Sequence, residues 1–573
     1  MATESAPPLT ANNVSHRFKF QFHRFANRLN SFNTYFAKLN HCPVTAINFR
    51  ISSLLLLILG LVVMEQASGQ PISLQAGRMK SSKNNGKMVQ LLKENVRFEQ
   101  SGSQVFCDEA EYDPESENLV GKGNVKIINT EGVTVTGRNL LYNNKTHLAK
   151  VEGNVILKDG TLELVTPWIQ YNTQTKVGWY NSGGNITDKD TRLNSRSGSY
   201  DPAKKTMYFK YNVVLTTPDY TVKTDTLQYK TDSRVASFFS ATQIDYKQTS
   251  ITFLRGWYNT EKEVGTFYRE VGLFEPGKTL VCDTLEFDKK NESGKCRGHV
   301  MIKDSINQLQ GWGKTGWYDG KIKQIHLFGN QEQKALVYQT DDPKEPFKIA
   351  ADTLLYYNDS NAEKAFDAIS NVSFLQAGFS GNTKRLTSWR TDSTIRFSKK
   401  PVLWDSSTRI SGDSMYMVIV RKKIRRLHVF PKAFSSLDEG NGYYSQVSGD
   451  SMVNYFNSNQ RIDAIRVYRK SKSIYFVRND SNQIESANCI EGGDMKIQML
   501  EGKVETVTFY RKPEGTLYPI DQLPKDKKQL SGFLWDPENR PNPVAFEPYF
   551  AAHIPVLPYA AKQTKSKKKE GKR

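Results

Sequence analysis

Seven aspartates recur along the chain, each one or two positions before an apolar residue: Asp108, Asp225, Asp283, Asp352, Asp413, Asp450 and Asp494. Carboxylates stacked at one position of a repeating β structure would suit cleavage of a glycan or binding of Ca²⁺. Each aspartate here, however, opens a predicted strand at a turn, where Asp is favoured because its side chain accepts hydrogen bonds from nearby backbone. We interpret all seven as turn residues and keep a β-helix glycan lyase or hydrolase as an alternative.

Other residues that could do chemistry are few and scattered. After residue 69 the histidines are His147, His299, His326, His428 and His553, far apart in the sequence. The chain has no phosphate-binding loop, His-Glu-x-x-His or nucleophile elbow. No cysteine pair has the spacing of zinc ligands. We therefore expect a protein that is not an enzyme, with no catalytic residue, metal or cofactor.

Two cysteines stand symmetrically about a predicted turn. Cys282 and Cys296 lie seven positions on either side of Lys289. Facing cysteines in a hairpin of an exported protein can form a disulfide. The spacing makes this pair the candidate disulfide and leaves two thiols as the other option.

The element that positions these residues is a β repeat. Six aromatic residues stand at a constant interval of 29: Tyr142, Tyr171, Tyr200, Tyr229, Tyr258 and Phe287. The phrases around them are variants of one another, as in Asp225-Thr-Leu-Gln-Tyr229 and Asp283-Thr-Leu-Glu-Phe287. Such self-similarity is typical of repeat proteins. Because no apolar stripe at helical spacing accompanies it, we predict an all-β array of hairpin repeats.

One repeat shows how a unit folds. Leu140 and Tyr142 share a strand face, and Asn143-Asn-Lys-Thr146 supplies a turn. The next strand alternates apolar and polar residues, and Gly153 interrupts it as a β-bulge would. The predicted inner face holds Leu140, Tyr142, Ala149, Val151, Val155 and Leu157, with Leu227, Tyr229, Leu285 and Phe287 as later counterparts. These residues either fill a closed core or line an open groove, and periodicity alone does not separate the two.

The ends of the chain differ from the array. Residues 1–69 form a basic leader with an apolar run from Ile51 to Met64, which predicts a cleaved signal peptide or a retained anchor. We expect a linker at 70–89, the array at 90–512 and a disordered Lys-rich tail at 561–573. Residues 513–560 are rich in Pro, and we expect them to cap the last strands. The first strand edge, near Val89 to Phe98, has no such cover.

The charge of the chain favours an anionic partner. The net charge is +20, and it falls to +16 without residues 1–69, which carry six Lys or Arg and two Asp or Glu. A basic exported protein suits lipid phosphates, acidic glycans or a membrane surface. Export excludes nucleic acid as the expected partner.

The repeat phrases resemble a known family. Gly137 to Asp159 and Asp108 to Ile127 carry the pattern of an aromatic, a turn and then Gly-Asn-Val, seen as Gly123-Asn-Val125 and Gly153-Asn-Val155. This pattern is similar to OstA-like domains, including the periplasmic bridge of lipopolysaccharide transport (LptA-like). The chain resembles the long stand-alone form found in Bacteroidota-type bacteria, over residues 90–400 well and 400–512 loosely.

The resemblance implies both a fold and a role. It implies an elongated, open β-jellyroll, a solenoid-like array whose apolar groove binds the acyl chains of lipid A. It also implies a periplasmic location, lipopolysaccharide as ligand, and partners of the same jellyroll type at the inner and outer membranes. The ten inner-face residues named above would then line the groove. A cell-envelope scaffold with a closed β core is the first alternative, and the glycan lyase or hydrolase is the second.

Overall fold

The computed structural model describes residues 73–558, with gaps at 85, 101–102, 130–131, 306–307, 340–345, 358–360, 377–378, 406, 421–422, 459–460, 480, 501–502, 549, 551–553 and 556–557. The predicted leader and the Lys-rich tail therefore lie outside the described residues. The chain divides into two compact units, and the described strands fall in residues 38–294 (the N unit) and 295–552 (the C unit). Among the described residues, no helix is long and apolar enough to cross a membrane.

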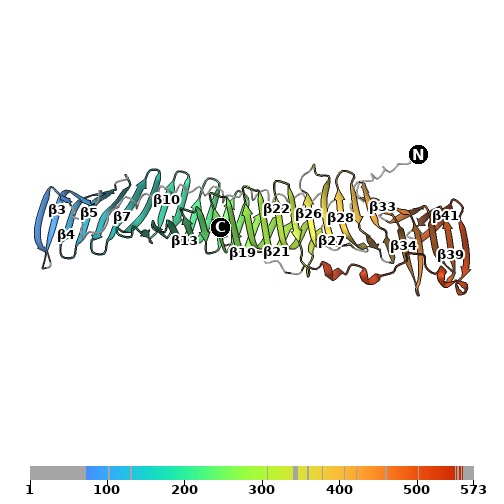
Figure 1. The fold of residues 1–573 in the computed structure, drawn as a ribbon. Coiled ribbons are helices and arrows are strands. Elements are labelled where there is room, and N and C mark those ends of the chain that lie inside the picture. Colours follow the sequence, from blue (N-terminus) through green and yellow to red (C-terminus); the bar gives the residue numbers. More distant parts are fainter. Residues whose placement is uncertain are drawn as a thin grey trace, which may run out of the picture. The chain divides into compact units, whose positions relative to one another are not determined.

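The N unit is built from antiparallel strands that follow one another in chain order (Figure 1). Apolar residues alternate with polar ones along most of them, as a sheet with one buried face requires. The predicted all-β fold is confirmed. The strands are β1 (Ser73–Gln75), β2 (Arg78–Asn84), β3 (Lys87–Gln100), β4 (Ser103–Asp113), β5 (Asn118–Ile128), β6 (Thr134–Asn143), β7 (Leu148–Asp159), β8 (Leu162–Asn172), β9 (Gly178–Tyr180), β10 (Gly184–Asp188), β11 (Thr191–Ser195), β12 (Ser197–Asp201), β13 (Thr206–Thr216), β14 (Tyr220–Lys230), β15 (Val235–Phe238), β16 (Thr242–Tyr246), β17 (Thr249–Phe253), β18 (Arg255–Asn259), β19 (Val264–Glu275) and β20 (Lys278–Asp288).

The pairing of these strands makes two layers. The first half of β7 pairs with the second halves of β6 and β8, and its second half pairs with their first halves. The two halves of β8 pair in addition with different strands, the first half with β10 and the second with β9, so one long strand contributes to both sheets. Elsewhere two short strands take the place of one long strand. For example, β9 lies in one sheet and β10 in the other.

The crossing point in alternate strands is a kink of two residues with left-handed backbone. In β7 these are Gly153 (φ 87°) and Asn154 (φ 53°), and the register of its pairing shifts between Glu152 and Val155. The predicted bulge at Gly153 is therefore confirmed. The same two-residue kink recurs at 94–95, 123–124, 211–212, 269–270, 298–299, 370–371, 399–400, 469–470 and 511–512. Gly-Asn of the repeat phrase is thus the kink itself, because Gly and Asn tolerate this conformation best.

Several of the recurrent aspartates accept hydrogen bonds from residues of this kink. Asp108 lies in the middle of β4, where its Oδ2 accepts a hydrogen bond of 2.9 Å from Asn124 Nδ2 in the kink of β5. Asp225 Oδ1 accepts one of 3.3 Å from the backbone N–H of Asn212. Asp352 Oδ2 accepts a hydrogen bond of 2.8 Å from the side-chain Nδ2 of Asn371. The prediction that the aspartates open strands was wrong for Asp108, Asp225 and Asp283, which lie within strands. It was right in position for the other four: Asp352, Asp413 and Asp450 directly precede a strand, and Asp494 begins one.

The C unit repeats the two-layer plan. One sheet runs from β24 through β42 and the other from β23 through β41, with β27 and β28 shared between them. The strands are β21 (Ser293–Asp304), β22 (Leu309–Asp319), β23 (Gln324–Phe328), β24 (Ala335–Gln339), β25 (Phe347–Ala351), β26 (Thr353–Tyr357), β27 (Lys364–Gln376), β28 (Phe379–Trp389), β29 (Thr394–Ser398), β30 (Val402–Trp404), β31 (Thr408–Ser411), β32 (Ser414–Val420), β33 (Lys423–Phe430), β34 (Ala433–Gly440), β35 (Tyr443–Gly449), β36 (Ser451–Phe456), β37 (Ile462–Tyr468), β38 (Ser471–Arg478), β39 (Ile484–Gly492), β40 (Asp494–Leu500), β41 (Lys503–Tyr510) and β42 (Glu514–Pro519).

The Pro-rich segment forms a strap and not a cap. It contains four short 3₁₀ helices, η3 (Ile520–Gln522), η4 (Lys525–Lys527), η5 (Pro537–Asn539) and η6 (Pro543–Phe546), and it returns across the sheet that β42 ends (Figure 1, red). The Nε of Arg409 in β31 lies 2.6 Å from Asp536 Oδ1, and Phe546 is fully buried. Trp535 packs edge-on against Trp404, with ring centroids 5.3 Å apart.

The strap covers the outer face of this sheet. Leu403 and Phe374 both pair with Gly381, so their side chains lie on the same face of the sheet. This face is the inner one, because the Phe374 ring packs between the layers against Phe397. The next residue, Trp404, therefore faces outward. Without the strap the outward aromatic side chains would be exposed to water. The strap also packs on the last strands of this sheet, where Leu523 shares a buried cluster with Ile474 and Phe476. The expected cover over the last strand edge was wrong, because β42 is exposed along most of its length.

Two further expectations need correction. Residues 73–84, expected to be a linker, form β1 and β2. Both strands pair with β3, so the first strand edge is not at Val89 to Phe98. Cys282 and Cys296 are thiols in this structure, and Cys282 donates a hydrogen bond of 3.3 Å to the carbonyl of Thr284. The turn at residues 289–292 has its midpoint after Lys290, so positions equidistant from Lys289 do not face each other.

The kink yields a test of the fold. We expect Gly153→Ala to destabilise the N unit by about 2 kcal/mol, because a side chain at φ 87° is strained and its Cβ would lie 2.7 Å from Arg138 Cβ. Gly160 has a left-handed φ of 56° with open space around it, so Gly160→Ala is the matched control and should cost less. Chemical unfolding of the two variants measures the difference. Equal losses would show that packing at the kink contributes nothing.

Candidate functional site

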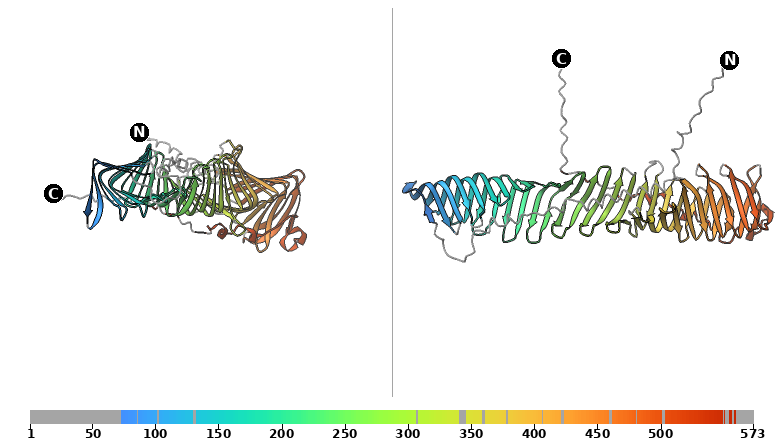
Figure 2. Two further views of the ribbon diagram at one scale, coloured as in Figure 1. Left: turned by 60° about the vertical axis from the view of Figure 1, so that its left-hand side comes forward. Right: turned by 90° about the horizontal axis from the view of Figure 1, so that it is seen from above.

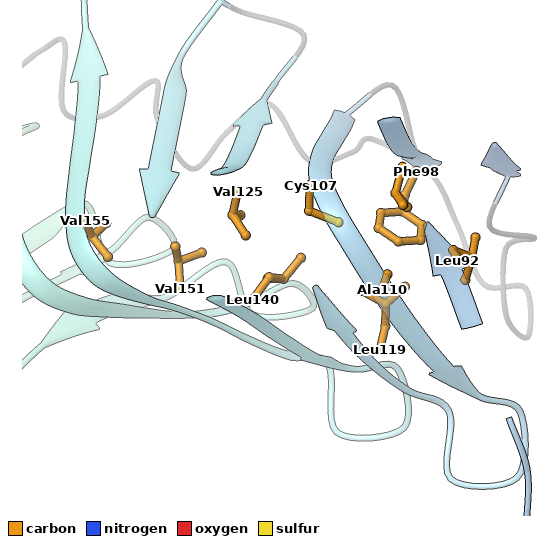
Figure 3. Packing of buried hydrophobic residues seen from close by; sticks show 10 residues of the cluster. Leu92, Phe98, Cys107, Ala110, Leu119, Val125, Leu140, Val151 and Val155 are labelled. Atoms are coloured by element: carbon orange, nitrogen blue, oxygen red, sulfur yellow. The ribbon is translucent and has the colours of Figure 1, made fainter. Parts of the chain in front are cut away.

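The interior of the N unit contains an apolar cavity of about 180 Å³ between the two sheets. Its lining comes from strands β3 to β9 and is almost entirely aliphatic or aromatic. Leu119, Leu140 and Val151 come from successive strands and converge on the interior (Figure 3). An engineered apolar cavity of about 150 Å³ stays dry and binds benzene. This cavity is thus suited to an apolar ligand.

Most of the inner-face residues predicted from one repeat meet here. Leu140, Tyr142, Ala149, Val151 and Leu157 all line the cavity. Val155 does not, but it is fully buried in the same apolar cluster. Strand parity was therefore sufficient to place these six side chains on the inner face. Phe98, Ile169 and Tyr171 also line the cavity; of these, only Tyr171 belonged to the predicted aromatic column.

The cavity is polar only where it nears the hairpin turns. Ser103, Asn129 and Thr173 line it beside the ends of β4, β5 and β8. Tyr142 donates a hydrogen bond of 3.0 Å to Asn144 Oδ1 in the adjacent turn, which also carries Lys145. Burial raises the pKa of the Tyr171 phenol well above its ordinary value, so this side chain is neutral at physiological pH. The apolar interior thus has a polar, uncharged rim.

The interior narrows along the chain. A second cavity of about 50 Å³ shares Leu157, Ile169 and Gly178 with the first. A third, lined by Leu227 and Tyr229, has only about 10 Å³, which is the limit for one water molecule. Leu285 and Phe287 are buried as well, at 0% and 4% exposure. The later inner-face residues therefore lie inside the fold as predicted, but Leu227 and Tyr229 stand in an almost filled core.

Tyr180 marks the change from open to filled interior. A Cβ on either Gly184 or Gly198 would overlap its ring, so the ring occupies space that two glycines leave free. Its hydroxyl shares a hydrogen bond of 2.7 Å with Ser195 Oγ, and both residues are buried. Burial raises the pKa of Tyr180 to about 12, although the bond to Ser195 opposes this shift. Tyr180 lies outside the 29-residue column, so no sequence pattern pointed to it.

The described residues around the cavity do not form a reaction centre. No group of three or more His, Cys, Asp or Glu that could hold a metal ion occurs within the described parts of the chain. Cys107 belongs to the apolar cluster, where burial raises the pKa of its thiol to about 11 and makes it a poor nucleophile. The arrangement can enclose apolar groups and offers them hydrogen bonds only at the rim.

Comparison with known proteins matches part of the chain. Residues 72–225 fit the family model of the OstA-like protein, which confirms the resemblance for this segment. No curated protein matches the sequence. Similar solved structures include LptH, the LptA-homologous periplasmic component of the lipopolysaccharide transport device of Pseudomonas aeruginosa. It is 12% identical, with 18% of this chain and 76% of that chain covered and a TM-score of 0.16.

A second solved structure is the extracellular domain of a one-component system from B. thetaiotaomicron. It is 8% identical, with 77% of this chain and 92% of that chain covered and a TM-score of 0.10.

The role of Tyr180 can be tested by two substitutions. Tyr180→Ala should destabilise the N unit by about 3 kcal/mol or more, because it leaves a cavity and an unpaired Ser195. Tyr180→Phe keeps the ring and should cost only about 1 kcal/mol. Hydrogen exchange of β9 and β12 measures both effects. A loss as large for Phe as for Ala would mean that the hydroxyl, and not the filling of the interior, is what matters.

Proposed function

We propose that this protein is a non-enzymatic carrier that shields the acyl chains of lipopolysaccharide during transport to the outer membrane. The observation that carries the proposal is the 180 Å³ apolar cavity, which lies within the segment that fits the OstA-like family. Each methylene that leaves water for such an interior contributes ~0.8 kcal/mol. Acyl chains would therefore enter without any chemical step.

The rim supports an amphiphilic ligand in place of a plain hydrocarbon. Ser103, Asn129 and Thr173 offer hydrogen bonds to polar groups that remain outside the cavity. The neighbouring turns carry Lys145 and Lys176, which suit lipid phosphates. The basic character of the chain, +20 in total, agrees with an anionic lipid.

We further propose that the carrier site is confined to the early strands. The 50 Å³ and 10 Å³ cavities that follow are too small to continue an acyl-chain path without rearrangement. Under this proposal the strands after β13 act as a spacer with a closed core. The closed-core scaffold thus remains as a second candidate function, favoured by the filled interior around Tyr229.

We place the protein in the periplasm, exported by its leader, with partners of the same jellyroll type at the inner and outer membranes. The described strand edges that lack a second neighbour at the end of the array are β41 and β42. Val507 and Leu517 on these edges are 39% and 61% exposed. Strand addition at such an edge is a general mode of binding between β proteins.

Site-specific photo-crosslinking tests the carrier proposal. A crosslinker at Tyr142 or Leu157 should capture lipopolysaccharide, because both line the cavity. Lys150 and Glu152 lie on the other face of β7, paired with each other, and are the matched controls that should stay unlabelled. Equal labelling of both faces, or none at Tyr142, would contradict the proposal.

The same experiment locates the end of the carrier site. A crosslinker at Tyr229 should capture no lipid, because the space beside it is about 10 Å³. Labelling at Tyr229 as strong as at Tyr142 would extend the groove along the N unit and remove the case for a closed spacer.

A crosslinker at Val507 or Leu517, introduced in cells, tests the partner contact. We expect a covalent adduct with another β-jellyroll transport component, identified by mass spectrometry, because these side chains stand on strand edges. Leu534 on the strap is similarly exposed, at 52%, but lies on no strand and serves as the control. Adducts from Leu534 alone would place the partner on the strap.

A further inference from the structure

A second concave surface of the N unit lies outside the sheets and is polar. It is a groove of about 860 Å³ along the kinks of β7 and β13 and the breaks between β9 and β10 and between β11 and β12. Five of its lining residues are asparagines, and its only charged side chain is Arg196. Because 24% of the chain is charged, a groove of this size without Asp, Glu or Lys is unusual for this protein.

The groove is separate from the apolar cavities. Leu164 and Ile186 point inward and line the 50 Å³ cavity, whereas their neighbours Val165 and Asn185 point outward and line the groove. Its occupant is therefore not the acyl chain discussed above, and the inference does not depend on that function.

The floor of the groove is held rigidly by backbone. Gly183 N–H donates to the carbonyl of Arg196 at 2.8 Å, and Arg196 N–H donates to the carbonyl of Tyr211 at 3.0 Å. Thr166 Oγ1 donates to the Gly183 carbonyl at 2.8 Å. Three neighbouring segments thus keep the side chains above them in fixed positions before any ligand arrives.

The amides above this floor are available for a ligand. Asn185 and Asn194 are directly opposite one another on paired strands, and both are exposed. Neither these two nor Asn154 and Asn181 make a side-chain hydrogen bond to any described residue. Each amide offers a carbonyl acceptor and two N–H donors. Together they offer both donors and acceptors to a ligand, without charge.

Tyr211 adds a flat apolar surface to the groove. Its side chain is 53% exposed, although its backbone is left-handed, with φ 65°. A bulky residue is strained in this conformation, which glycine adopts freely and does adopt at the equivalent position of β5 and β7. Other described kinks also carry another residue than glycine at this position, but those residues are charged or Ser, whereas Tyr211 presents an exposed aromatic ring, which indicates a use outside the fold.

We propose that this groove binds a glycan. The hydroxyl groups of a sugar donate and accept hydrogen bonds at once, as the asparagine amides do. The exposed face of Tyr211 suits the less polar face of a sugar ring. Arg196 provides for one anionic group, a phosphate or a carboxylate, on an otherwise neutral chain. Two envelope glycans share this chemistry: the sugars of lipopolysaccharide and the glycan strand of the cell wall.

Calorimetric titration of the full chain tests the proposal with two probes. One is lipopolysaccharide oligosaccharide freed of acyl chains, and the other is a peptidoglycan tetrasaccharide. Binding of one probe and not the other identifies the source. Heat from neither probe at millimolar concentration overturns the proposal.

Matched variants then locate the site. Tyr211→Gly removes the ring while relieving the backbone, so the protein should fold at least as well and lose about tenfold in affinity. Asn185→Ala with Asn194→Ala should abolish binding. Arg269→Gly makes the same backbone change at the equivalent kink of β19, where Arg269 has φ 61°, and should leave affinity unchanged. Equal losses for Tyr211→Gly and Arg269→Gly would overturn the assignment to this groove.

Discussion

The two-residue left-handed kink is the constraint on which the rest of the structure depends. A flat antiparallel meander would expose one apolar face of every strand, whereas a strand that turns at its middle can pair in two sheets and enclose that face. At Gly153 and Asn154 the backbone makes this turn without strain at the first position, because glycine has no Cβ that could clash. Figure 2 shows the resulting hairpins of each unit stacked in sequence. Aspartates of neighbouring strands accept hydrogen bonds at these kinks: Asp225 from the backbone N–H of Asn212, and Asp108 from the side-chain amide of Asn124.

The size of the inner side chains then decides whether the enclosed space is a cavity or a core. Between β3 and β8 the inner positions carry aliphatic residues as small as Ala149 and Val151, and space remains. From Tyr180 onward the inner positions hold larger rings, among them Phe253 and Phe267, which stack with centroids 4.4 Å apart. Close packing of this kind leaves no room for a ligand. The same backbone arrangement therefore encloses an apolar cavity in one stretch of the N unit and a filled core in another.

The sequence was informative where a pattern has a direct physical cause. Period-two alternation placed Leu140, Val151 and Leu157 on the inner face, because successive strand residues point to opposite sides. It did not reveal the role of Asp108, because a kink in mid-strand and a hairpin turn favour the same residue types. The prediction that Cys282 faces Cys296 depended on the position of the turn centre. A shift of this centre by one residue changes which residues face each other along the whole hairpin.

The strap and the narrowing of the interior were beyond the reach of the sequence for another reason. Both depend on contacts between residues far apart in the chain, such as Arg409 with Asp536, which no local periodicity encodes. Tyr180 is likewise defined by Gly184 and Gly198, whose missing side chains make room for its ring. The alternation of apolar and polar residues does not reveal such a space, because glycine has no side chain that assigns it to the inner or the outer face.

The position of the cavity gives the family match a physical meaning. Residues 72–225 fit the OstA-like model, and the two larger apolar cavities are lined by residues between Phe98 and Phe209. Beyond that segment the kinks continue, as at Arg269 and Ser370, but most of them carry another residue than glycine at their first position. The hydrogen bonds between strands thus maintain the backbone shape where the Gly-Asn motif is lost. They do not maintain the cavity, because they do not prevent larger side chains from filling it. The N unit therefore keeps one backbone arrangement along its length, while the apolar space inside it falls from about 180 Å³ to about 10 Å³.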